Sequence, residues 1–143
     1  MSDSVIMNCY STGTVVGEGG VGGIVGMFGA SISNCYYLAG CVSNDNNFGT
    51  AMTADQFVSG EVAYLLGGVW GQDLDNGKTV QSVPTFTGAE VFPINSDCLG
   101  NARYSNTDED KPIHTLTHVP GENTSCTENG AVEHWHCDAC GKN

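Results

Sequence analysis

Short β-prone runs separated by glycines make up most of the first forty residues of the chain. The apolar segments at residues 14–17 and 22–26 are interrupted by glycine, and eight glycines fall between Gly13 and Gly29. A helix is not expected there, because each glycine costs roughly 1 kcal/mol relative to alanine in a helix interior. The pattern instead predicts short strands joined by glycine turns.

The same part of the chain carries an internal repeat. Residues 6–10 (IMNCY) return as residues 32–36 (ISNCY), 26 positions later. Repeats of this length stack as the coils of a β-helix, in which equivalent side chains lie over one another. The period therefore predicts that Cys9 lies over Cys35 and that Tyr10 lies over Tyr36. The two cysteines are expected to be small buried residues, with a disulfide between neighbouring coils as the alternative.

After the repeat, the spacing of apolar residues changes from that of strands to that of a helix. Thr53 and Gln56 form a capping-box pattern, apolar residues follow at helical spacing, and two glycines end the run. We predict one amphipathic helix over residues 53–66, with Gly60 as its weak point, which closes the end of the coil stack. Further strands are predicted at residues 69–72, 83–86 and 89–92, with a turn at 75–78.

Charge restricts the classes of partner. The chain has 16 acidic and 4 basic residues and a formal net charge of −12, which would repel nucleic acid and anionic membrane surfaces. No apolar run approaches the ~20 residues of a membrane span, so no membrane insertion is predicted. A repeat that begins directly after residues 1–3 is what we expect of a fragment excised from a longer protein, so a missing signal sequence carries no weight.

Several motifs are similar to cofactor or catalytic motifs but lack their required context. Residues 17–22 fit G-x-G-x-x-G, yet no helix pattern follows and the next acidic residue is Asp45. Residues 73–77 hint at a calcium loop but are one position short of the EF-hand register and lack its closing Glu. No G-x-S-x-G, H-E-x-x-H or S-x-x-K motif is present. We therefore predict that the chain is not an enzyme.

The repeat also carries a resemblance to a known family. Residues 8–13, 22–26 and 32–36 resemble the GLUG repeats of bacterial surface proteins, which occur in adhesin-like proteins and beside IgA-protease domains. The resemblance covers roughly residues 4–40, about one and a half repeats, and implies a right-handed β-solenoid in an extracellular stalk. Residues 52–92 resemble a segment that often follows such repeats in clostridial surface proteins.

These observations predict a mainly β fold with three parts. Residues 1–92 are expected to form a truncated right-handed β-solenoid of GLUG-type coils, capped by one helix and a β-hairpin. Residues 93–113 are polar and are expected to be a linker. Residues 114–143 are expected to form a small, zinc-ribbon-like Cys/His β module.

The last segment contains the candidate metal ligands. Residues 114–143 hold three of the seven cysteines and all four histidines, and Cys137 and Cys140 form a C-x-x-C pair that can place two thiolates on one zinc ion. Cys126 and one histidine would complete a tetrahedral site. The segment resembles a short module, often found in tandem, in surface proteins of gut clostridia. That resemblance implies the ligand set His114, Cys126, Cys137 and Cys140, with His118 as the substitute for His114.

Disulfide bonding is the alternative reading of these cysteines. A secreted protein lies in an oxidising compartment, where a bond between Cys137 and Cys140, or from Cys126 to either, would leave the histidines without a role. The odd number of cysteines means that at least one is free, metal-bound or paired outside the chain. A bound zinc ion would be structural, because four protein ligands leave no open position.

We therefore expect a non-catalytic structural or interaction module of a secreted bacterial cell-surface protein, with a role in adhesion or as a stalk or spacer. Its expected location is extracellular, at the cell surface or cell wall. Its expected partners are a host or cell-wall glycan or protein and the rest of the parent protein. The alternative is a carbohydrate-binding module accessory to a larger surface enzyme, since four aromatic residues could stack on sugar rings: Tyr36, Tyr37, Trp70 and Trp135.

Overall fold

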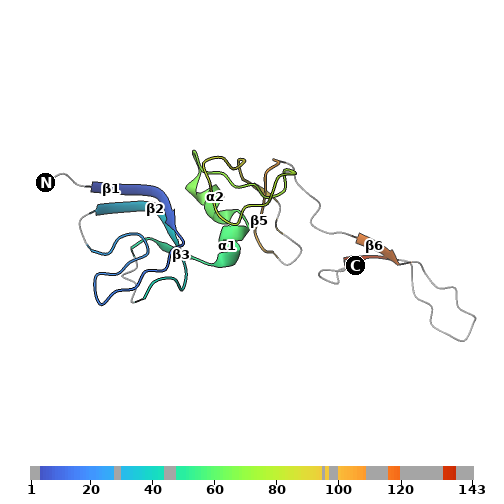
Figure 1. The fold of residues 1–143 in the computed structure, drawn as a ribbon. Helices are drawn as coiled ribbons and strands as arrows, with labels where there is room; N and C mark the ends of the chain where they lie inside the picture. Colours follow the sequence, from blue (N-terminus) through green and yellow to red (C-terminus); the bar gives the residue numbers. More distant parts are fainter. Residues whose placement is uncertain are drawn as a thin grey trace, which may run out of the picture. The chain divides into compact units, whose positions relative to one another are not determined.

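The two copies of the repeat form neighbouring parallel strands in the computed structural model, which describes residues 4–27, 30–43, 48–94, 96, 100–108, 116–119 and 134–137. Strands β1 (Ser4–Ser11), β2 (Ala30–Leu38) and β3 (Thr50–Met52) lie in the order β1-β2-β3 (Figure 1). Cys9 pairs with Cys35 and Tyr10 with Tyr36, so the stacking predicted from the 26-residue period is confirmed.

The helical segment begins as predicted but breaks in the middle. Thr53 caps α1 (Ala54–Val58), and its capping box with Gln56 is complete. The chain then turns at Gly60, where φ is 91°, and continues as α2 (Glu61–Leu66). The prediction of one helix over residues 53–66 is therefore wrong, because Gly60 adopts a left-handed conformation that interrupts helical hydrogen bonding.

The two short helices supply most of the core. Buried Met52, Phe57, Val62 and Leu66 form its centre. Five partly buried residues pack against them, namely Tyr10, Tyr36, Leu38, Trp70 and Val83. The core thus joins the C-terminal half of β2 to the helices, and burial of these side chains is what fixes α1 and α2 against the sheet.

The predicted hairpin after the helices is reduced to a single bridge. Gly71 and Thr85 exchange two backbone hydrogen bonds of 2.8 and 2.7 Å, but the flanking residues form loops rather than strands. The last strand predicted at residues 89–92 appears three positions later as β4 (Phe92–Ile94), which pairs with β5 (Arg103–Ser105).

The predicted solenoid is wrong. In the described part of the chain the parallel sheet has three strands, the third of only three residues, and no sheet closes into coils. Residues 14–17 and 22–26, expected to supply further strands of each coil, form turns and bends except for one bridge from Val15 to Val42. Their glycines provide no side chains for a buried coil wall, and Val16 is exposed to solvent. The mainly β expectation is corrected with it, because two short helices share the core and the fold is mixed α/β.

The chain forms two units, which we describe separately. One comprises Met1–Pro93 with Tyr104–Asp108, and the other comprises Ile94–Arg103 with Glu109–Asn143. The second unit contains an antiparallel pair, β6 (Leu116–Val119) and β7 (His134–Cys137), with His118 opposite Trp135. No helix among the described residues has the length and apolar character needed to cross a membrane.

Candidate functional site

The residues predicted to bind zinc lie almost entirely outside the described part of the chain. His114, Cys126 and Cys140 are not described, and Cys137 is described only as the last residue of β7, opposite Leu116. The described residues contain no group of three or more His, Cys, Asp or Glu side chains that could hold a metal ion. That finding does not bear on the predicted ligand set, which stays a prediction.

A ladder of identical residues runs across β1 and β2. Asn8 and Asn34 both have positive φ, at 53° and 50°, a conformation that asparagine tolerates better than most residues. The Asn34 side chain donates from Nδ2 to Asn8 Oδ1 at 2.7 Å and to the Leu66 carbonyl at 3.2 Å. This amide pair therefore fixes the register of the two strands and connects them to the end of α2.

The two cysteines of the ladder are adjacent. Cys9 Sγ lies 3.3 Å from Cys35 Sγ, and both residues are free thiols in the structure. Burial, followed by the hydrogen bond and charge of Cys35, raises the pKa of Cys9 to about 11. The Cys9 thiol is consequently protonated near neutral pH, which makes it a poor nucleophile and a poor metal ligand in that state.

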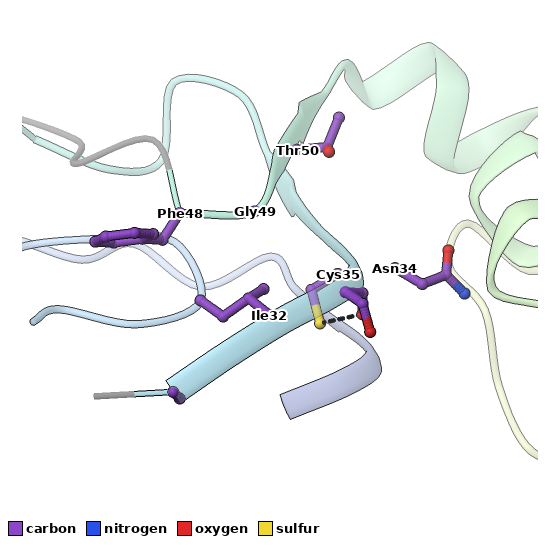
Figure 2. Close-up of a pocket in the computed structure, with 8 residues that line it drawn as sticks. Ile32, Asn34, Cys35, Phe48, Gly49 and Thr50 are labelled. Atoms are coloured by element: carbon purple, nitrogen blue, oxygen red, sulfur yellow. Dashed lines mark hydrogen bonds between the residues drawn. The ribbon is translucent and has the colours of Figure 1, made fainter. Parts of the chain in front are cut away.

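Beside Cys35 is an open cavity of about 420 Å³. Its lining comes from β2 and the start of β3, and Figure 2 shows Ile32, Cys35 and Phe48 around it, with Asn34 pointing away. The dashed line marks the Cys35 thiol donating to the Ser33 carbonyl at 3.1 Å. Among the residues that the structure describes, the lining contains no acidic or basic side chain.

The aromatic residues proposed as a sugar platform are mostly used inside the fold. Tyr37 is buried, with 5% of its surface exposed, and the Tyr36 hydroxyl donates to Asn34 Oδ1. Trp70 donates from Nε1 to the Asn8 carbonyl at 2.8 Å. Its ring contacts Tyr10 edge to face and Phe86 at a centroid distance of 4.2 Å. The side chain of Trp135 is not among those described.

Phe86 is an exposed aromatic residue that the sequence analysis did not single out. Its ring lies against Trp70 with 69% of its surface open to solvent. A smaller cavity of about 170 Å³ is lined by Trp70 together with Tyr64 and Glu90. Phe86 has no distinguishing signal in the sequence, because its position depends on the contact with Trp70 across a sixteen-residue loop.

The acidic loop at residues 73–77, which has a pattern similar to a calcium loop, holds carboxylates that already accept hydrogen bonds from the protein. Asp73 Oδ1 accepts from Asn76 Nδ2 at 2.8 Å and from the Ala89 backbone at 3.0 Å. These bonds, with a smaller contribution from Lys78, lower the pKa of Asp73. Asp75 accepts from the Ser105 hydroxyl and from the Asn106 backbone. Both carboxylates thus stabilise the loop itself, and a cation would have to displace these donors.

Asn106 connects the same loop to the chain on both sides. Its Oδ1 accepts from the Leu74 backbone at 2.6 Å and from Asp75 at 3.2 Å, while its Nδ2 donates to the carbonyls of Gln72 and Glu90. Sequence reasoning placed this residue in a linker. Asn106 can hold this loop only because the fold brings it next to residues more than thirty positions earlier in the sequence.

Comparison with known proteins identifies no similar protein. No protein-family model matches the chain, and neither a curated protein nor a solved structure matches it.

Proposed function

We propose that the chain is a non-catalytic structural and interaction module of a secreted bacterial cell-surface protein, with a role in adhesion or as a spacer. The main support is the use of its polar side chains. Asp73, Asp75 and Asn106 each hold backbone or side-chain donors of the fold, and Gln72 is fully buried between carbonyls. Polar side chains that make such hydrogen bonds within the protein stabilise its loops rather than act on a substrate.

The exposed apolar side chains around this loop support the interaction part of the proposal. Val69, Val80 and Phe86 each expose more than half of their surface. Apolar side chains that form one contiguous exposed patch mark surfaces that bind a partner, and we propose that these three belong to such a patch. The resemblance to GLUG-repeat surface proteins supports an extracellular location, and the partner would be a host or cell-wall glycan or protein.

The location and the binding role can be tested separately. Antibodies against the chain should label intact cells of the source bacterium, and external protease should remove the label. Labelling only after the cells are broken would contradict the surface location. For binding, the whole chain would be tested on panels of host and cell-wall glycans and of host extracellular proteins, with Phe86→Ser expected to weaken any interaction at least several-fold. Val16→Ser is the matched control, because Val16 is also exposed but lies in the glycine-rich turns.

A carbohydrate-binding role is the second candidate, and Phe86 is the observation that favours it. One face of its ring is available to a sugar while the other side meets Trp70. Glu90, which lines a cavity together with Trp70, is exposed and could accept hydrogen bonds from sugar hydroxyls. Binding of a glycan that is lost in Phe86→Ala and kept in Val16→Ala would favour this candidate over a protein partner. A glycan panel without any hit would exclude it.

We further propose that His114, Cys126, Cys137 and Cys140 bind one structural zinc ion in the second unit. The support is the residue set, since three thiolates and an imidazole are ligands that zinc prefers. Elemental analysis should give one zinc per chain, with Cys126 protected from thiol labelling until a chelator is added. Cys126→Ser should lose the metal, and His118→Ala should keep it. A metal-free protein with these cysteines paired would overturn the assignment.

A further inference from the structure

The pair Cys9 and Cys35 has the backbone arrangement that an inter-strand disulfide requires. The two residues are direct partners in the parallel register of β1 and β2. Neighbouring strands lie about 4.8 Å apart, which is inside the ~4.4–6.8 Å range of Cα separations that disulfides span. Side chains of directly paired residues leave the sheet on the same side. The backbone therefore needs no rearrangement for the two sulfurs to bond.

The sulfur atoms already face each other. Their separation of 3.3 Å exceeds a disulfide bond length by only about 1.3 Å, which a small side-chain rotation can close. The hydrogen bond between the side chains of Asn34 and Asn8, one position earlier in each strand, holds the register at this point. The third cysteine described in this unit, Cys41, does not contact either sulfur within hydrogen-bond distance.

We propose that Cys9 and Cys35 form a redox-active pair, which a low-molecular-weight disulfide such as oxidised glutathione converts into a bond between β1 and β2. Cys9, the more exposed of the two, attacks the oxidant through its thiolate form, which its raised pKa makes a small fraction at neutral pH, and releases one glutathione thiolate. Cys35, 3% exposed, then attacks the Cys9 sulfur of the mixed disulfide and releases the second glutathione. Two protein thiols are oxidised, the oxidant is reduced to two thiols, and the two protons pass to the departing thiolates.

The bond would close the loop between residues 9 and 35. It would also anchor β1, which in the described part of the chain pairs with β2 and with no other strand. The inference is independent of the proposed function, because it depends on the register and the two sulfurs and not on any partner. It differs from the buried small residues that the sequence analysis preferred and develops the disulfide that was given there as the alternative, and it assigns the two residues a chemistry that changes with the redox conditions around the protein.

Peptide mapping can identify the bond in the whole chain. A protease that cleaves after glutamate cuts at Glu18, which lies between the two cysteines, and next at Glu61. After incubation with oxidised glutathione and blocking of free thiols, the unreduced digest should contain residues 1–18 linked to residues 19–61. Because Cys41 also lies in the second peptide, the mapping is repeated with Cys41→Ser, which should keep the link, and with Cys9→Ser, which should abolish it.

The second measurement asks whether the fold itself favours the bond. The chain is equilibrated with mixtures of oxidised and reduced glutathione, both folded and in concentrated urea. The folded chain should form the bond at an oxidant ratio about a hundredfold lower than the unfolded chain. The proposal is overturned if the linked peptide is missing from Cys41→Ser, or if folded and unfolded chains need the same ratio. The wild-type mapping does not depend on any variant folding correctly.

Discussion

Replacing Asn106 with alanine should destabilise the first unit more than its position in a polar segment suggests. Three of its hydrogen bonds are shorter than 3.0 Å, to the Leu74 backbone at 2.6 Å and to the carbonyls of Gln72 and Glu90 at 2.8 and 2.9 Å. A typical hydrogen bond contributes about 1 kcal/mol net. The loss of these three bonds predicts a decrease of about 3 kcal/mol in the free energy of unfolding, because Asn106→Ala removes the side chain that pairs with the Leu74 backbone donor and with the carbonyls of Gln72 and Glu90.

The assay is urea unfolding followed by the fluorescence of Trp70, which lies in the core of the first unit. Trp135 belongs to the second unit, so both proteins would carry Trp135→Phe. A loss of 3 kcal/mol corresponds to a midpoint lowered by ~1.5–2 M at a urea slope of ~1.5–2 kcal/mol per molar. The experiment is done under reducing conditions so that disulfides do not contribute.

Asn76→Ala is the matched control, because Asn76 is also half-buried in the same loop. It donates one hydrogen bond, to Asp73 Oδ1, and accepts one from the Lys78 backbone at 3.2 Å. We expect it to cost about 1 kcal/mol. The reasoning fails if Asn106→Ala costs no more than Asn76→Ala, since the loop would then be held by something other than the Asn106 side chain.

Three further predictions use the same unfolding assay. Gly60→Ala should lower the free energy of unfolding by about 2 kcal/mol or more, because φ is 91° and a Cβ would lie 2.6 Å from Leu74 Cδ1. Gly77→Ala is the control, with a φ of 82° and open space around the position, and it should lower the free energy by less. Equal losses for the two variants would contradict the steric argument. Phe57→Ala should cost ~3–5 kcal/mol, because the side chain is 2% exposed in the core, and a loss near 1 kcal/mol would mean that the core can collapse around the gap. Finally, the pKa of Cys9 is raised from 9.0 to about 11, so its contribution to stability is complete below pH 9 and is lost as the pH rises toward 11. Cys9→Ser should lack this part of the alkaline decline, and an identical pH profile would refute it.

The sequence predictions that proved accurate were those for features that depend on neighbouring residues or on the repeat. The 26-residue repeat correctly predicted that Cys9 stacks on Cys35, because identical strand segments with the same pattern of apolar residues favour the same register. The capping box at Thr53 was also correct, since its two hydrogen bonds involve residues only three positions apart. Gly60 was recognised as a weak point, and the structure shows a complete break there.

The expectations that failed required knowledge of how distant segments pack. The solenoid was extrapolated from one and a half repeats, but the glycine-rich connections form turns, and α1 and α2 complete the core instead of further coils. The surface role assigned to Tyr37 failed because the residue is buried. Gly23 approaches its ring so closely that a Cβ would lie 2.2 Å from Tyr37 Cγ, a contact that no local pattern reveals.

The sequence by itself determined the features whose causes are local: the repeated strands, the helix start at Thr53 and the weak point of the helix at Gly60. The tertiary structure decided which side chains share a site. Asn106 reaches a loop more than thirty residues away, and the ring of Phe86 contacts the ring of Trp70 sixteen positions earlier. The physical reason is the sequence separation of the interacting residues. Hydrogen bonds within a turn join residues that are close in the sequence, whereas burial and side-chain contacts join residues that are far apart and depend on how the whole chain packs.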